Sequence, residues 1–221
     1  MAIQGNRLAL AHWRRMVAEI YAEVRATAVA EPAVAAARFR ARRERLFMQH
    51  PESPVSVAER SKWQGAAWYP YDPAWRVTGE VALATATTTF EIPLAADGAV
   101  RCSRIGTVAF VIGGASARLT LYWFEGYGGG LWLPFCDATN GETTYGGGRY
   151  LYDTIKGADL GADPGAAPGA LLLDFNYAYN PSCAYDHRWS CPLAPVENRL
   201  GVAITAGEQS PLPARLPPEG A

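Results

Sequence analysis

The first fifty residues alternate apolar and polar positions with the period of a helix. Between Leu8 and Arg25, apolar side chains recur at three- and four-residue spacing, which places them on one stripe of a helix. Glu31-Pro32 interrupts this stripe, and a proline suits the first turn of a second helix that we expect to run to about Met48. The chain should therefore begin with a helical segment, residues 1–50, that packs on the core.

The connection that follows combines a helix signal with an aromatic loop. Ser56 to Glu59 has the spacing of a capping box, which predicts one more short helix. Beyond it, Pro70 and Pro73 break a run of large rings that cannot form a regular element for long. The loop either lines a ligand site through stacking contacts or seals one end of the core, and sealing is the commoner role. Its rings are Trp63, Trp68, Tyr69, Tyr71 and Trp75.

From Arg76 onward, short β-branched and aromatic runs are separated by turn residues, which is typical of an all-β sandwich or barrel. Asp97-Gly98, Gly113-Gly114 and Asn140-Gly141 are hairpin signals, so neighbouring strands should be antiparallel. The candidate strands are Arg76 to Ala84, Thr87 to Ile92, Val100 to Ser103, Thr107 to Ile112, Ala117 to Phe124, Leu131 to Phe135, Thr144 to Tyr152, Ala170 to Asp174 and Leu200 to Thr205.

These patterns predict an α+β fold that is mainly β. We expect N-terminal helices on an antiparallel β-sandwich or barrel of about nine strands. The β-rich domain should occupy residues 51–208, and the Pro-rich stretch at 209–221 should be a tail.

Charge and composition narrow the partners. Twenty basic and 21 acidic residues give a net charge of −1, so no overall field favours nucleic acid or an anionic membrane surface. Arg38, Arg40, Arg42, Arg43 and Arg45 make the second helix basic, and in a neutral chain we interpret them as a solvated face rather than a phosphate site. Oligomeric state is not readable from this pattern.

Location and thiol state follow from what the chain lacks. No stretch approaches the roughly 18 apolar residues of a membrane span, and Met1 to Arg15 has no apolar run typical of a secretory signal. We therefore expect a cytoplasmic protein. In that reducing compartment Cys102, Cys136, Cys183 and Cys191 should be free thiols.

Several motifs resemble known sites but lack the required spacing. Gly128-Gly129-Gly130 and Gly146-Gly147-Gly148 match neither phosphate-loop nor dinucleotide spacing, so we interpret them as bulges or turns. A stretch beginning at Asp137 resembles a calcium loop, but Gly148 stands where a bidentate glutamate is required. Neither Gly-x-Ser-x-Gly nor His-Glu-x-x-His occurs. The sequence therefore predicts no metal and no cofactor.

Unusual chemistry is concentrated between Asp174 and Leu200. This block is dense in hydrogen-bonding heads and large rings, and buried polar groups must find partners or face a ligand. Two interpretations remain open, a rigid loop tied by its own hydrogen bonds and one wall of a binding site.

The two cysteines of this block make its conformation testable. Cys183, His187 and Cys191 lie at four-residue spacing, so on a helix the two thiols would be about 12 Å apart, too far for a disulfide or a shared zinc. In a folded loop, a disulfide closing nine residues would add roughly 2.6 kcal/mol. We expect unbridged thiols near the pocket.

Three functional hypotheses follow. The first is a small-molecule pocket between Tyr145 to Tyr150 and Asp174 to Asn198, with Arg149 holding an anionic group unless it is buried against Asp174 or Glu197. The second is a hydrolase or lyase using Asp174 and Glu197 as acid and base. The third is a structural or interaction domain. The candidate ligand-binding residues are Tyr145, Arg149, Tyr150, Asp174, Asn176, Asn180, Cys183, Tyr185, Cys191 and Asn198.

The chain also resembles a known family. The stretches Phe135 to Gly141, Thr144 to Leu151, Asp174 to Leu200 and Ala206-Gly-Glu208 are similar to the bacterial and archaeal family catalogued as domain of unknown function 1684. The resemblance covers about Arg42 to Glu208, including Ser53-Pro54 and Trp68 to Arg76. In that family position 136 more often carries a basic or polar residue and His187 is outside the motif, which argues against a metal site there. The resemblance implies no reaction.

Overall fold

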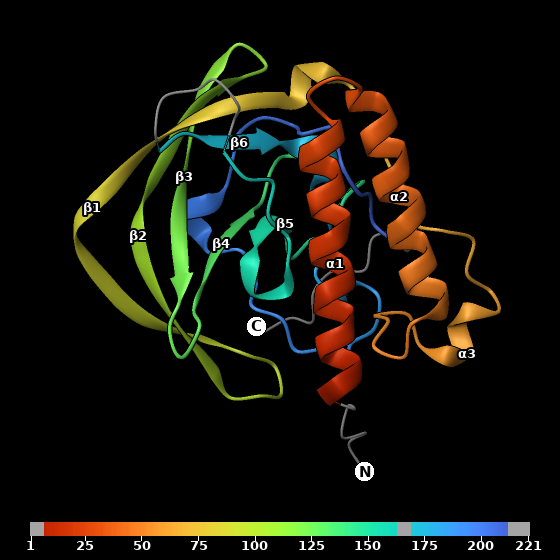
Figure 1. Ribbon diagram of the computed structural model, residues 1–221. Helices are drawn as coiled ribbons and strands as arrows, with labels where there is room; N and C mark the ends of the chain where they lie inside the picture. Colours follow the sequence, from red (N-terminus) through yellow and green to blue (C-terminus); the bar gives the residue numbers. More distant parts are fainter. Residues whose placement is uncertain (1–6, 163–168, 212–221) are drawn as a thin grey trace.

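The computed structural model describes residues 7–162 and 169–211, as a helical layer beside a curled antiparallel sheet (Figure 1). The helices are α1 (Arg7–Thr27), α2 (Pro32–Gln49) and α3 (Val57–Arg60), so all three predicted helices are confirmed. The capping interaction at α3 is present, since Ser56 Oγ accepts a hydrogen bond from Glu59 N at 3.3 Å. None of the helices in these ranges is long and apolar enough to cross a membrane.

Six strands form one sheet with the order β5-β4-β3-β2-β1-β6, and every neighbouring pair is antiparallel. The strong prediction of a mainly β, antiparallel fold with N-terminal helices is confirmed, and the sheet is nearly closed like a barrel. The strands are β1 (Arg76–Pro93), β2 (Ala99–Ile112), β3 (Ala115–Phe124), β4 (Gly130–Phe135), β5 (Arg149–Asp153) and β6 (Leu171–Asp174).

The predicted count of nine strands is wrong, for two physical reasons. Four candidate runs merge into β1 and β2, because the breaks between them are register shifts within continuous strands, after Leu83 and after Arg104. The last candidate, Leu200 to Thr205, is irregular and forms no strand. The seventh, Thr144 to Tyr152, is a turn until Arg149, where β5 begins. Of the predicted tail, residues 212–221 lie outside the described residues.

Long curved strands allow the sheet to approach closure. The first residues of β1 pair with β6, and the rest of β1 pairs with β2. The two edge strands are linked by a side chain instead of a ladder, since Tyr152 OH on β5 donates to Leu172 O on β6 at 2.6 Å. This hydrogen bond satisfies one carbonyl of the β6 edge.

The helices α1 and α2 lie side by side on one side of the curled sheet (Figure 1). Ile20, Tyr21 and Val24 of α1 enter the same core as Phe39 of α2, whose ring packs edge-on against Tyr177 at 5.0 Å. Close approach of α1 to the turn after β5 depends on Gly157, where an added Cβ would lie 2.8 Å from Ala18 N. The helical layer is therefore seated on backbone as well as on side chains.

We expect Gly157→Ala to destabilise the protein more than the matched change Gly98→Ala. Both glycines have positive φ, +86° and +78°, but an added Cβ at Gly98 meets nothing within 4 Å. The backbone term is common to both changes and is about 1 kcal/mol. Displacing α1 should add about 1–3 kcal/mol to the loss for Gly157→Ala alone. Urea denaturation measures both, and equal losses would contradict the close packing of α1 on this turn.

Candidate functional site

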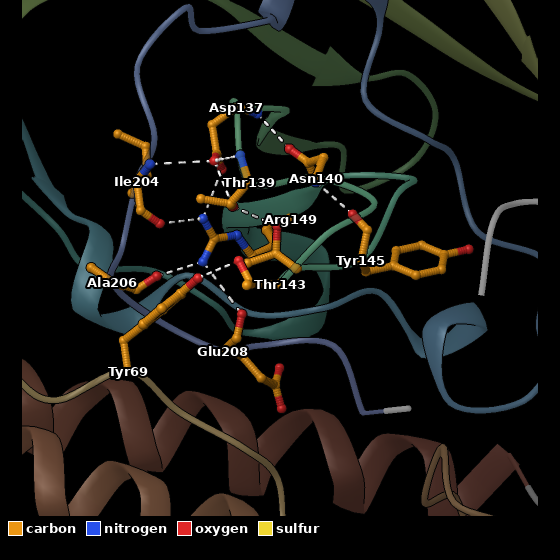
Figure 2. Close-up of polar contacts among 11 residues, drawn as sticks. Tyr69, Asp137, Thr139, Asn140, Thr143, Tyr145, Arg149, Ile204, Ala206 and Glu208 are labelled. Atoms are coloured by element: carbon orange, nitrogen blue, oxygen red, sulfur yellow. Dashed lines mark hydrogen bonds and ion pairs between the residues drawn. The ribbon is translucent and has the colours of Figure 1, made fainter. Parts of the chain in front are cut away.

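Arg149, the first residue of β5, is fully buried and held by protein atoms from two distant segments (Figure 2). Its Nη2 lies 2.7 Å from Asp137 Oδ2, an ion pair in which neither side chain is exposed. The same nitrogen donates to Ile204 O at 3.0 Å, and Nη1 donates to the carbonyls of Ala206 and Glu208. The guanidinium thus joins β5 to the turn at Asp137 and to the strap formed by residues 199–208.

The partner of Arg149 sits in a tightly bonded turn. Asp137 Oδ1 accepts from Thr139 N at 2.8 Å and from Thr139 Oγ1 at 2.6 Å, and Gly141 has φ +85° (Figure 2). The side chain of Asn140 contacts Asp137 N and Tyr145 O. The predicted turn at Asn140-Gly141 is present, and the Asp137 carboxylate is committed to Arg149 and the turn.

This geometry corrects the role expected of Arg149. An anion-binding guanidinium must offer paired donors to a ligand, whereas Nη1 and Nη2 here already donate to protein oxygens. The predicted alternative, burial against a carboxylate, is observed, but the carboxylate is Asp137 and not Asp174 or Glu197.

A second closed network surrounds Glu208, which the sequence did not single out as a site residue. Its buried carboxylate accepts from Arg43 Nη2 at 3.1 Å, from Asn180 N at 2.8 Å and from Tyr185 OH. Arg43 comes from α2, and its side chain is only 13% exposed. One arginine of the basic helix therefore packs into the protein, where we expected a solvated face. Asn180 and Tyr185, both expected to bind ligand, are engaged here.

Asp174 and Asn176 lie at the end of β6 and fasten the aromatic loop. Asn176 Oδ1 accepts from Asp72 N at 3.0 Å, and its Nδ2 donates to Asp72 O and to Asp174 Oδ1. Trp68 from that loop packs edge-on against Phe39 at 5.8 Å. These contacts fit the sealing role for the loop. Burial raises the pKa of Asp174 to about 6, although hydrogen bonds from Asn176 oppose the shift.

Glu197 and Asn198 have different surroundings. Arg104 Nη2 donates to Glu197 Oε1 at 2.6 Å on the exposed side of the block. Asn198 is buried and connects the block to the sheet by hydrogen bonds. Its Oδ1 accepts from Thr120 N, and its Nδ2 donates to Thr120 O and Pro134 O. Within the described residues, none of the contacts joins Glu197 to Asp174, so no geometry supports them as an acid–base pair.

Predicted residues do come together around the middle of the block. Tyr145 OH lies 3.7 Å from Cys183 Sγ. Tyr150 is buried, and its hydroxyl donates to the carbonyl of Pro192, the residue after Cys191. We call Tyr145, Cys183 and Cys191 the thiol site.

The segment between the cysteines is a folded loop, not a helix. Only Ser182–Ala184 form one turn of 3₁₀-helix, and turns follow. Both thiols are free and half-buried. The hydrogen bond from Cys183 and the nearby Lys156 ammonium lower the pKa of Cys191, against the opposing effect of burial. The same hydrogen bond and burial raise the pKa of Cys183.

A groove of about 430 Å³ lies elsewhere, between α1 and α2, with His12, Met16, Arg45 and His50 in its wall. Glu52 N donates to His50 Nδ1 at 3.0 Å, so a neutral His50 carries its proton on Nε2 and donates to His12 Nδ1, also at 3.0 Å. This pairing satisfies the buried ring of His50. None of the residues that line the groove was predicted from the sequence as a ligand contact.

Replacing Arg149 by methionine should lower the free energy of unfolding by about 3–5 kcal/mol, because Asp137 is left as an uncompensated buried charge. Arg118→Met on the exposed side of β3 is the matched control and should change stability by less than about 0.5 kcal/mol. Urea denaturation measures both variants. Equal effects would mean that the buried ion pair does not organise this region.

The raised pKa of Asp174 predicts a pH-dependent stability. A carboxyl whose pKa is higher in the folded state stabilises the fold below its unfolded value of 3.8, and this contribution is lost as pH rises through about 6. The stability of the wild type minus that of Asp174→Asn should therefore fall by about 2 kcal/mol between pH 4 and pH 7. The pKa of Glu197 is lowered on balance, so the stability of the wild type minus that of Glu197→Gln should rise over the same pH range. If the stability difference between the wild type and Asp174→Asn does not change with pH, the raised pKa of Asp174 is contradicted.

Comparison with known proteins supports the resemblance found in the sequence. The family described as "Protein of unknown function (DUF1684)" matches residues 61–209. The solution NMR structure of the uncharacterized protein from gene locus rrnAC0354 of Haloarcula marismortui is similar to this chain, with 33% sequence identity and a TM-score of 0.59. That alignment covers 78% of this chain and 91% of the other. A search of the curated proteins gives no significant match. With a family match over most of its length, the chain belongs to the DUF1684 family.

Proposed function

We propose that the protein binds a small molecule at the thiol site, where the Tyr145 to Tyr150 segment meets the middle of the Asp174 to Asn198 block. The observation that carries the proposal is the 3.7 Å contact of Tyr145 OH with the half-buried thiol of Cys183. A binding site needs polar groups that are fixed by the protein and still reachable from solvent. The thiol site meets both requirements.

The other candidate residues are poorer choices as ligand contacts. Arg149, Tyr185 and Asn198 bind protein partners through their side chains, as does Asn180 through Nδ2, which donates to Gln209 O. The thiol site, by contrast, belongs to the residues matched by the family, whereas the groove at His12 and His50 lies outside that range.

The chemistry of the site favours a small uncharged ligand. Lys156 Nζ lies 3.4 Å from Asp153 Oδ2, so the ammonium already has a carboxylate partner. The terminal nitrogens of Arg149 likewise donate to protein oxygens, so the anionic group first assigned to Arg149 is not retained. Burial raises the pKa of Tyr145, which keeps its hydroxyl protonated and able to donate to a ligand oxygen.

Tyr145→Phe tests this proposal because it removes the hydroxyl and keeps the ring. A set of uncharged fluorinated fragments screened by ¹⁹F NMR should contain binders to the wild type. Tyr145→Phe should weaken their binding about fivefold, the equivalent of one hydrogen bond of about 1 kcal/mol. Tyr127→Phe, at a fully exposed tyrosine, is the matched control and should leave binding unchanged. Fragments that bind both variants equally, or no binders at all, would refute the site.

A further inference from the structure

We propose that the groove between α1 and α2 is a second binding site, and that its ligand is a small carboxylate with an apolar tail. Its volume of about 430 Å³ lies within the roughly 300–1,000 Å³ of small-molecule sites. Ala9, Met16, Leu46 and Pro51 form an apolar wall that suits the tail. The groove shares no residue with the thiol site and precedes the residues matched by the family, so the two proposals stand or fall separately.

The hydrogen bonds of two histidines fix which atom His12 offers to the groove. Glu52 N donates to His50 Nδ1 at 3.0 Å, so the proton of a neutral His50 is on Nε2. That proton is donated to His12 Nδ1, also at 3.0 Å, so a neutral His12 carries its proton on Nε2. No acceptor for this second proton lies among the described residues. His12, which lines the groove, therefore has a free N–H donor for a ligand.

The ring of His50 is held in place from several sides. It is buried and packs edge-on against Trp13 at 5.2 Å. Its carbonyl accepts from Arg60 Nη2 at 2.7 Å. Burial lowers the pKa of His50, and the charges of His12 and Arg60 act in the same direction. A neutral, fixed ring at position 50 sets the donor of His12 before a ligand arrives.

Arg45 supplies the charge of the groove. Three other arginines of α2, Arg38, Arg42 and Arg43, each pair with a glutamate. Arg45 is exposed and has no carboxylate partner within residues 7–162 and 169–211. The residues that line the groove include no acidic side chain. With His50 neutral, the wall therefore presents one guanidinium that is free to pair with an anion.

These donors select a carboxylate over other polar groups. A carboxylate has two oxygens, so one can accept from Arg45 and the other from His12. Its single negative charge balances the single guanidinium. A phosphate monoester carries about −1.5 to −2 charges at neutral pH and would keep an excess of negative charge beside an apolar wall. An alcohol of the same length would leave Arg45 without a counter-charge.

Hexanoate, 1-hexanol and acetate separate the contributions of charge and tail in a titration followed by NMR. Hexanoate should bind with a saturable curve, 1-hexanol about tenfold more weakly, and acetate at least tenfold more weakly. Arg45→Met should weaken hexanoate about tenfold and leave 1-hexanol unchanged. Arg38→Met, at an exposed arginine of α2 outside the groove, is the matched control and should bind hexanoate as the wild type does. Equal binding of hexanoate and 1-hexanol, or equal effects of the two variants, would refute the site.

The side-chain nitrogens of the histidines give a second, independent readout. The chain has only three histidines, so long-range ¹H–¹⁵N spectra resolve each ring. At neutral pH, His12 and His50 should both carry their protons on Nε2. Hexanoate should shift the nitrogens of His12 and leave those of the exposed His187 unchanged. A proton on Nδ1 of His12, or nitrogens of His12 that do not respond to hexanoate, would overturn the proposal.

Discussion

The buried ion pair between Arg149 and Asp137 is the constraint on which the rest of this structure depends. A guanidinium cannot lose its charge inside a protein, so its burial requires a carboxylate and several carbonyls in fixed positions. Here the carbonyls come from the strap at residues 199–208, and this requirement positions a segment that forms no strand. Backbone hydrogen bonds also hold the strap, but they run to separate segments, such as Cys136 and Ala178, and form no continuous ladder. The strand-like apolar pattern from Leu200 to Thr205 therefore does not become a strand.

Glu208 extends that constraint to the helical layer. Its carbonyl accepts from Arg149, while its carboxylate binds Arg43 of α2 and two groups of the block, Asn180 N and Tyr185 OH. One residue thus links the sheet, the helices and the block through contacts that exclude water. Charges that are buried and paired with protein groups are unavailable to a ligand, so the polar side chains of the block serve mainly to fix its shape.

The division between predictable and unpredictable features follows from the range of the interactions. Helices and hairpin turns depend on neighbours in sequence. The Leu8 to Arg25 stripe therefore correctly predicted the first helix, and the glycines at 98, 113 and 114 correctly predicted turns. The block was also correctly recognised as rich in groups that need partners. Which groups would close on protein depended on pairings such as Arg149 with Ala206 and Arg43 with Glu208, separated by 57 and 165 residues, and no local pattern records them.

The same rigidity extends to the segment that carries Cys183. A free loop of this length would sample many conformations, and ordering it on binding would oppose binding. Here Arg188 and Trp189 anchor the loop to the connection after α2, and Tyr150 holds the carbonyl of Pro192 beyond its end. Because the loop is ordered before a ligand arrives, less entropy remains to be lost on binding. The closed charge networks therefore fix the position of the half-buried edge at which Tyr145 contacts Cys183.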